Sequence, residues 1–177
     1  MAQDEHILWL AISTSLVMLT LPGVALFYGG MVRKKNVLNT MGLVFLALAL
    51  ASLEWLFWGE RLAFGFDGAG AGGSQGVRSS LALHHAMSGA LALALISGTL
   101  VERVRFVFFL LFGLVWIGVV YGPIAHWLWG GGWLTRLGAL DFAGGAVIHL
   151  SAGVSALVAA LVIGPRSGYG RIEMIPH

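Results

Sequence analysis

The sequence contains no cysteine and few charged side chains, and both shortages restrict what the chain can be. Without cysteine there is no disulfide, no thiolate nucleophile and no thiolate metal ligand. Charged residues make up 10% of the 177 residues, against about 25% in soluble domains, whereas hydrophobic residues make up 58% and the mean hydropathy is +0.88. The formal net charge of +2 comes from scattered residues without a basic stripe, which excludes a nucleic-acid partner. The composition indicates an integral membrane protein.

Five apolar segments each approach the ~20 residues that a membrane-spanning helix requires. They cover, to within a few residues, positions 7–30, 37–58, 80–101, 107–128 and 143–164. A chain in hydrocarbon must satisfy its own backbone groups, and alternating strand patterns are absent, so we predict an all-α integral membrane protein with five transmembrane helices. The acidic start MAQDEH lacks the positive region of a signal peptide and is predicted to be a tail.

The basic residues predict the orientation in the membrane. If the N-terminus lies outside, the inner loops hold seven of the ten basic residues, namely Arg33, Lys34, Lys35, Arg103, Arg105, Arg166 and Arg171. The outer loops then hold Arg61, Arg78 and Arg136. Since basic residues concentrate on the cytoplasmic side, we predict a multi-pass protein of the plasma or bacterial inner membrane with its N-terminus outside and its C-terminus inside.

The last apolar segment carries His149 near its middle. An ionisable group at membrane depth is costly unless it faces a partner helix or a water-filled cavity, so it indicates a functional site. On an ideal α-helix the face of His149 is made of small residues, namely Gly145, Ala152, Gly153, Ala156 and Ala160. The opposite side, predicted to face lipid, holds Val147, Leu150, Val154, Leu157, Val158 and Leu161. We therefore expect His149 to line a groove or narrow passage; the alternative is a structural histidine bonded to a neighbouring helix.

Two further groups of polar residues lie within the apolar segments. Glu54 and Arg61 are seven residues apart, on roughly one helical face, and are predicted to form a pair that reaches toward the membrane surface. His84 and His85 are adjacent, so their side chains point about 100° apart on a helix. With no carboxylate or cysteine at ligand spacing beside them, no metal site is predicted there.

Several long strings of the sequence carry a family resemblance. GVALFYGGMVRKKNVLN, LAFG, GTLVERVRF, PIAHWLWGGGWLTRLGALDFAGGAVIHLSAGVSALVAALVIGPRSGYG and the final PH resemble the Amt/Mep/Rh ammonium transporter family, in the family's order and spacing. Strings of this length are far more specific than short patterns. The resemblance implies an eleven-helix subunit of a homotrimer, built from two five-helix halves that are inverted in the membrane plane. Residues 1–177 resemble the N-terminal half, so we expect the chain to be truncated at its C-terminus, before the second half.

The resemblance also implies roles for three residues. His149 matches the first of two facing pore histidines, which would relay a proton. Trp129 matches the tryptophan at the outer ammonium site, where an indole holds a cation by cation–π attraction of roughly 0.5–2 kcal/mol; an interfacial belt residue is the alternative. Asp141 matches an aspartate near the external end of the fifth helix, where it caps free N–H groups and adds negative potential. Direct coordination of ammonium by Asp141 is disfavoured, because a capping carboxylate has its lone pairs occupied.

The sequence departs from the family at the gate. The family's Phe-Gln-x-x-Phe string falls on His84, His85 and Ser88, so both phenylalanines are missing from this candidate gate region. The usual Tyr-Ser before LAFG is replaced by Glu60 and Arg61. Because an aromatic constriction excludes hydrated ions and water, these changes put the ordinary selectivity in doubt.

We expect the complete protein to transport ammonium for nitrogen uptake. Trp129 would recruit the ion, which would lose its proton because a bare charge in hydrocarbon is costly, and neutral ammonia would cross beside His149. The proton would return outside or pass through the histidines. No nucleophile and base pair and no carboxylate dyad point to an enzyme, and no cofactor is expected. A cytoplasmic nitrogen-regulatory protein is an expected partner; the alternatives are an ammonium-sensing membrane module of a signalling protein and a non-conducting fragment.

Overall fold

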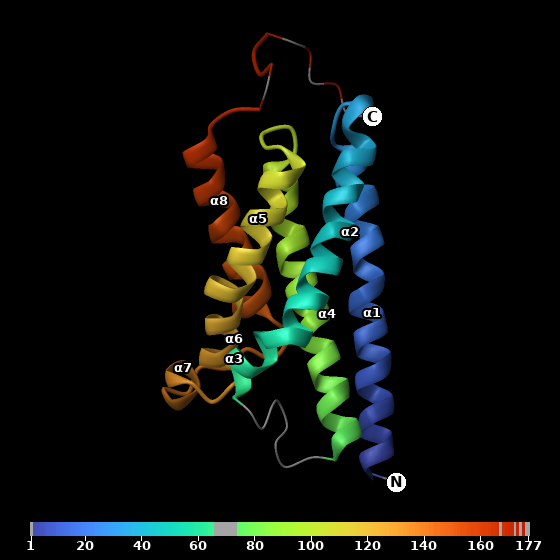
Figure 1. Cartoon of the computed structure of the whole chain (residues 1–177), viewed down its shortest axis with the longest axis vertical. Coiled ribbons are helices and arrows are strands. Elements are labelled where there is room, and N and C mark those ends of the chain that lie inside the picture. Colours follow the sequence, from blue (N-terminus) through green and yellow to red (C-terminus); the bar gives the residue numbers. More distant parts are fainter. Residues whose placement is uncertain (1, 66–73, 167, 172, 174, 176–177) are drawn as a thin grey trace.

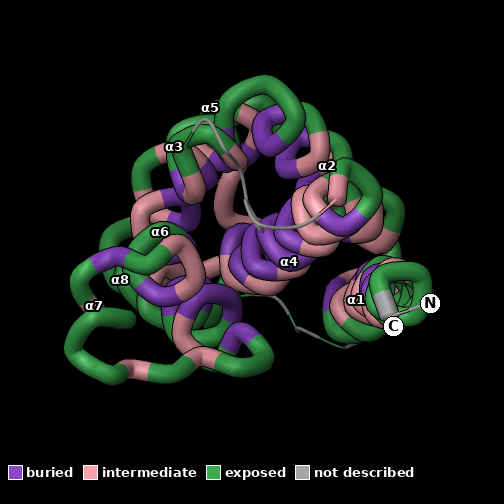
Figure 2. The backbone as a smooth tube through the Cα atoms, turned by 90° about the horizontal axis from the view of Figure 1, so that it is seen from below, coloured by how far each residue is buried: buried purple, intermediate pink, exposed green. Residues whose placement is uncertain are grey.

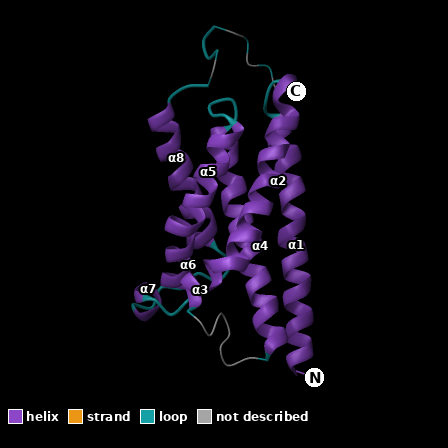
Figure 3. Cartoon of the chain, viewed as in Figure 1, coloured by secondary structure: helices purple, strands orange, loops and turns teal. Residues whose placement is uncertain are grey.

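The protein is a bundle of five long helical spans, and no strand occurs in the residues that the structure describes (Figures 1 and 3). The structure is a computed structural model that describes residues 2–65, 74–166, 168–171, 173 and 175. Five spans are long and apolar enough to cross a membrane: Gln3–Gly30, Lys34–Phe64, Gln75–Leu100, Phe106–Arg136 and Gly145–Ile163. The prediction of an all-α membrane protein with five spans is thereby confirmed. Several spans extend beyond the predicted segments at the end of the bundle near the N-terminus, because their helices continue through less apolar turns such as Gln75–Ser80.

Three of the described spans are composite, because a π-helical segment interrupts their α-helices or, in the fifth span, precedes the α-helix. The first and third are single helices, α1 (Ala2–Gly30) and α4 (Gln75–Leu100). The second span consists of η1 (Lys34–Asn36), α2 (Val37–Glu54), the π-helical η2 (Trp55–Gly59) and α3 (Glu60–Phe64). The fourth contains α5 (Phe106–Trp116), the π-helical η3 (Ile117–Tyr121), α6 (Gly122–Leu128) and the short α7 (Trp133–Arg136). The fifth contains the π-helical η4 (Gly145–Leu150) and α8 (Ser151–Ile163). π-Helical turns are rare and frequently mark functional sites.

Helix α4 lies at the centre of the bundle and packs against α1, α2 and α8 (Figure 2). Its buried surface is dominated by small residues, namely Ala86, Ser88, Gly89, Ala90, Ala92, Ala94 and Ser97. Small residues allow helices in a membrane to approach closely. At Gly98 a Cβ atom would lie 2.5 Å from the ring of Tyr28, whose hydroxyl donates a hydrogen bond to the Leu95 carbonyl at 3.1 Å. Two of the sequence strings that carry the family resemblance therefore meet at the contact between α1 and α4.

A buried carboxylate joins the loops at the end of the bundle opposite the N-terminus (Figure 1). Glu102 has a φ of +61°, in the left-handed region, and its side chain is 1% exposed. Its Oε1 accepts hydrogen bonds from Asn36 Nδ2 and from Arg33 Nε, the latter at 2.9 Å, and its Oε2 lies 4.0 Å from Arg166 Nη1. Burial raises the pKa of Glu102, but the hydrogen bonds from Arg33 and Asn36 and the Arg33 charge outweigh it and hold the pKa below the usual value. One carboxylate thus fixes three segments of the chain together.

Candidate functional site

The carboxylate of Asp141 caps the first turn of the fifth span. Its Oδ1 accepts a hydrogen bond from the Gly145 N–H at 2.7 Å, and its Oδ2 accepts from Ala146 at 2.9 Å and from Val147 at 2.7 Å. Gly144, with a φ of +81°, lets the chain turn into the helix. These N–H groups have no partner within the helix, and a negative charge at this position is favourable. Both oxygens are occupied, which fits the predicted capping role.

The indole of Trp129 is tied to the same turn. Trp129 follows the last residue of α6 and is half-buried. Its Nε1 donates a hydrogen bond to the backbone carbonyl of Asp141 at 2.7 Å. Two of the predicted site residues are therefore brought together, and the turn that begins the His149 helix also orients the indole.

The ring of His85 is stacked between two other aromatic rings. It is 9% exposed, and its centroid lies 4.7 Å from that of Phe64 and 5.2 Å from that of Trp129, with interplanar angles of 22° and 26°. The ring centroid of Trp55 lies 6.2 Å from that of His85 at an interplanar angle of 60°, and the Tyr121 hydroxyl donates a hydrogen bond to the His85 carbonyl at 2.8 Å. Phe64, Trp55 and Tyr121 are not predicted as site residues from the sequence, although Phe64 lies in the LAFG string that carries part of the family resemblance.

The three residues of the candidate gate region do not point to one place. His84 Nδ1 lies 3.2 Å from Thr14 Oγ1 of α1, on the side of α4 that faces α1. The Ser88 hydroxyl donates to the His84 carbonyl at 2.9 Å, within its own helix. Only His85 joins the aromatic rings around Trp129. Among the described residues no group of three His, Asp or Glu side chains could hold a metal ion.

His149 lies in the π-helical segment η4 and is exposed in this chain. The predicted faces of this helix are partly wrong, because they assumed α-helical spacing. Val147, predicted to face lipid, is fully buried, and Ala152, predicted to line the groove, is 2% exposed and packed in the core. A π-helical turn contains more residues than an α-helical one, so it rotates the side chains before it relative to those after it. Leu150, Val154, Leu157, Val158 and Leu161 are exposed, as predicted.

The predicted pair of Glu54 and Arg61 is wrong. Glu54 is 3% exposed, its Oε1 accepts a hydrogen bond from Trp58 Nε1 at 3.1 Å, and its Oε2 has no partner in the described part of the chain. A Cβ atom at Gly118 of η3 would lie 3.1 Å from Glu54 Oε1, so the carboxyl packs against the fourth span. The π-helical segment η2 lies between the two residues and removes the α-helical spacing on which the prediction depended.

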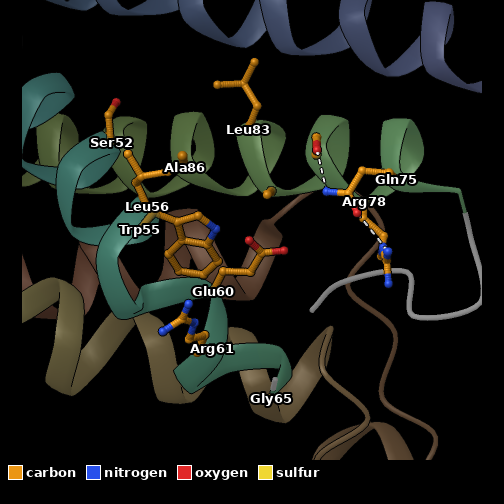
Figure 4. Close-up of a pocket in the computed structure, with 12 residues that line it drawn as sticks. Ser52, Trp55, Leu56, Glu60, Arg61, Gly65, Gln75, Arg78, Leu83 and Ala86 are labelled. Atoms are coloured by element: carbon orange, nitrogen blue, oxygen red, sulfur yellow. Dashed lines mark hydrogen bonds between the residues drawn. The ribbon is translucent and has the colours of Figure 1, made fainter. Parts of the chain in front are cut away.

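A cleft of about 660 Å³ opens beside the aromatic rings that surround His85, between the end of the second span and the first half of α4 (Figure 4). Trp55 forms part of its wall and also contacts the rings of His85 and Tyr121. The charged side chains at the cleft are Glu60, Arg61 and Arg78, two of which replace the family's Tyr-Ser. The indole of Trp55 therefore borders both the charged cleft and the aromatic rings of the candidate site.

All three π-helical segments contribute to the candidate site. Trp55 begins η2, Tyr121 ends η3, and η4 carries both His149 and the N–H groups that Asp141 caps. The fold and the site define a helical membrane protein in which an aromatic cluster adjoins a span with an exposed histidine.

Comparisons with known proteins identify the family. A profile of the Ammonium Transporter Family matches residues 8–177, and the chain belongs to this family. The ammonium transporter Amt1 of Archaeoglobus fulgidus is 42% identical over 183 residues, covering 98% of this chain and 47% of that protein. An ammonium transporter of Bacillus subtilis is 48% identical over 168 residues, covering 85% and 42%.

Solved structures give the same result for the fold. The crystal structure of Candida albicans Mep2 matches with a TM-score of 0.81 and 32% identity, over 97% of this chain and 43% of that one. Saccharomyces cerevisiae Mep2 matches with a TM-score of 0.76 and 33% identity, over 89% and 42%. The chain therefore spans a little under half the length of the relatives that it matches, in agreement with one half of the transporter fold.

Proposed function

We propose that this chain supplies the first half of an ammonium transporter. In this mechanism ammonium is recruited at an outer vestibule, loses its proton there and crosses as neutral ammonia along a hydrophobic pore lined by histidine. The observation that carries the proposal is the connection between Trp129, Asp141 and η4. The Trp129 indole donates to the Asp141 carbonyl at 2.7 Å, and the Asp141 carboxylate caps the turn that bears His149. One short segment can therefore hold a cation-binding ring and a pore histidine in a fixed relation.

Each of these residues has a chemical role in the proposal. Trp129 attracts the cation through its π face. Asp141 orients the indole and the start of the helix, and its negative charge favours a cation nearby without binding it directly. His149, exposed on η4, lines the pore and relays the proton, because one nitrogen of a neutral imidazole accepts a proton while the other donates one. Its exposure in this chain supports a position at the interface with the second half, where inverted-repeat transporters bind their substrates.

The proposal includes the setting of the protein in the cell. The chain lies in the plasma or bacterial inner membrane with its N-terminus outside and its C-terminus inside. The complete protein forms a homotrimer and binds a cytoplasmic nitrogen-regulatory protein, as the family resemblance implies. The polar cluster around Glu102 then lies on the cytoplasmic side, where such a partner would approach.

Uptake of radiolabelled methylammonium by transporter-deficient cells tests the proposal. Two forms are compared: the 177-residue chain alone, and the chain fused to the second half of the Archaeoglobus transporter. The chain alone is expected to insert without saturable uptake, whereas the fusion restores it. Trp129→Ala in the fusion should raise KM, and Trp133→Ala, which removes an exposed tryptophan nearby, should not. Robust saturable uptake by the chain alone, or an unchanged KM in Trp129→Ala, would contradict the proposal.

One observation favours a second candidate, an ammonium-sensing module that binds the ion without conducting it. The phenylalanines of the family gate are absent, and the space beside Trp129 is filled by the His85 ring. A fusion that binds methylammonium but never accumulates it would favour the sensor.

A further inference from the structure

The stacked rings around His85 are a feature that the transport mechanism does not use. Cation–π attraction acts within about 6 Å of a ring centroid. The His85 ring lies 5.2 Å from Trp129 and 4.7 Å from Phe64, so it occupies the position from which a cation would interact with both rings. The two stacks are close to parallel, so the imidazole covers one face of each neighbour.

The indole is fixed, whereas the imidazole is held by stacking. Trp129 Nε1 is bonded to the Asp141 carbonyl, and Asp141 is itself fixed by the three hydrogen bonds of its carboxylate. The backbone of His85 is anchored by the Tyr121 hydroxyl. Its ring, in contrast, makes no hydrogen bond within the described part of the chain, and Nδ1 is buried without a partner. When this cluster opens, the His85 side chain is the part that can turn.

We infer that His85 is a resident occupant of the cation-binding face of Trp129, and that an ammonium-type cation reaches the indole only after this ring has turned away. The inference rests on the proposed role of Trp129 in recruiting ammonium. His85 is then a positioning residue that lowers the affinity of the outer site, and it replaces the missing phenylalanine gate with a ring from a different position of α4. After it has turned, its unpartnered nitrogen can accept a hydrogen bond from the N–H of the ion.

The test measures binding directly on the 177-residue chain in lipid nanodiscs. The probe is methylammonium chloride, with sodium chloride as the reference salt, and the readout is the NMR signal of the Trp129 indole N–H, assigned by its loss in Trp129→Leu. His85→Ala should tighten binding about two- to tenfold, the factor that corresponds to one aromatic stacking pair. His85→Phe preserves the stack and should not tighten the binding of methylammonium. The matched control is Leu83→Ala, which shortens an exposed side chain on the same helix and should leave the affinity unchanged.

The outcomes separate the inference from the function on which it rests. Before any ligand is added, His85→Ala should move the Trp129 signal through the lost ring current, and a signal that does not move would overturn the stack itself. A saturable shift with equal affinity in the unsubstituted chain and in His85→Ala overturns the inference but leaves Trp129 as the recruiting residue. No saturable shift in either form overturns both. Tighter binding of methylammonium by His85→Ala, but not by His85→Phe or Leu83→Ala, supports the inference.

Discussion

Replacing Asp141 tests whether this residue caps a helix or binds the substrate. Asp141→Ala removes three hydrogen bonds to the first N–H groups of η4. Loss of a cap costs about 0.5–2 kcal/mol, and loss of a favourable charge at a helix N-terminus costs about 0.3–1 kcal/mol. Asp141 is only half-buried, so water can replace part of the hydrogen bonding that the substitution removes. We expect a loss of about 1–2 kcal/mol, or roughly 2–8 °C in melting temperature at 2–4 °C per kcal/mol for a chain of this size.

The assay combines thermal melting with methylammonium titration of the same sample in nanodiscs. Asp141→Asn keeps one acceptor oxygen but loses the charge, and should lower the melting temperature by about half as much as Asp141→Ala. Phe142→Ala serves as the control, because this neighbouring side chain is fully exposed. The affinity for methylammonium should fall together with the melting temperature and no further, because the same cap also holds the Trp129 ring. An Asp141→Asn protein that melts normally but no longer binds methylammonium would refute the capping assignment and favour direct coordination.

Three further experiments test the role of His149, the orientation in the membrane and the ion pair of Glu102. In the fusion, His149→Ala should change the free energy of unfolding by less than about 1 kcal/mol but alter the transported charge in proteoliposomes; a proportionate loss of stability and activity would instead indicate a packing role. Cysteines at Ser74 and Lys34 should react with impermeant thiol reagents from outside and inside respectively, and labelling of Lys34→Cys in intact cells would reverse the orientation. Because the folded pKa of Glu102 is lowered, its stabilising contribution is present above the ordinary glutamate pKa of about 4.3 and is lost as the pH falls through the folded value. Melting curves should show this acid loss, and Glu102→Gln should remove it.

The number and type of the spans could be predicted from the sequence, because twenty apolar residues in a row leave few structural alternatives. The cap at Asp141 is expected from the family resemblance, and it also follows a local rule, because an aspartate just before a helix commonly caps its free N–H groups. Neither conclusion requires knowledge of how the helices pack.

The orientation of individual side chains could not be predicted to the same extent. The faces of the fifth span and the pairing of Glu54 were derived from α-helical spacing, and each fails where a π-helical turn intervenes. No composition signal distinguishes Gly145–Leu150 from an ordinary helical turn. The stack of His85 on Phe64 and Trp129 joins three distant parts of the chain, so only the tertiary structure reveals it.

The π-helical turn at Gly145–Leu150 has a consequence for insertions and deletions. Such a turn is equivalent to one residue inserted into an α-helix, whose residues advance by about 100° each. Deletion of Ala146 would allow the segment to close into a regular α-helix and, because the wide turn already absorbs the extra residue, it would leave Asp141 and the attached Trp129 in nearly the same orientation relative to α8. A single deletion here should therefore be tolerated by both the helix and the recruiting ring, whereas a single deletion within the regular helix α8 should turn the residues on its two sides by about 100° relative to each other.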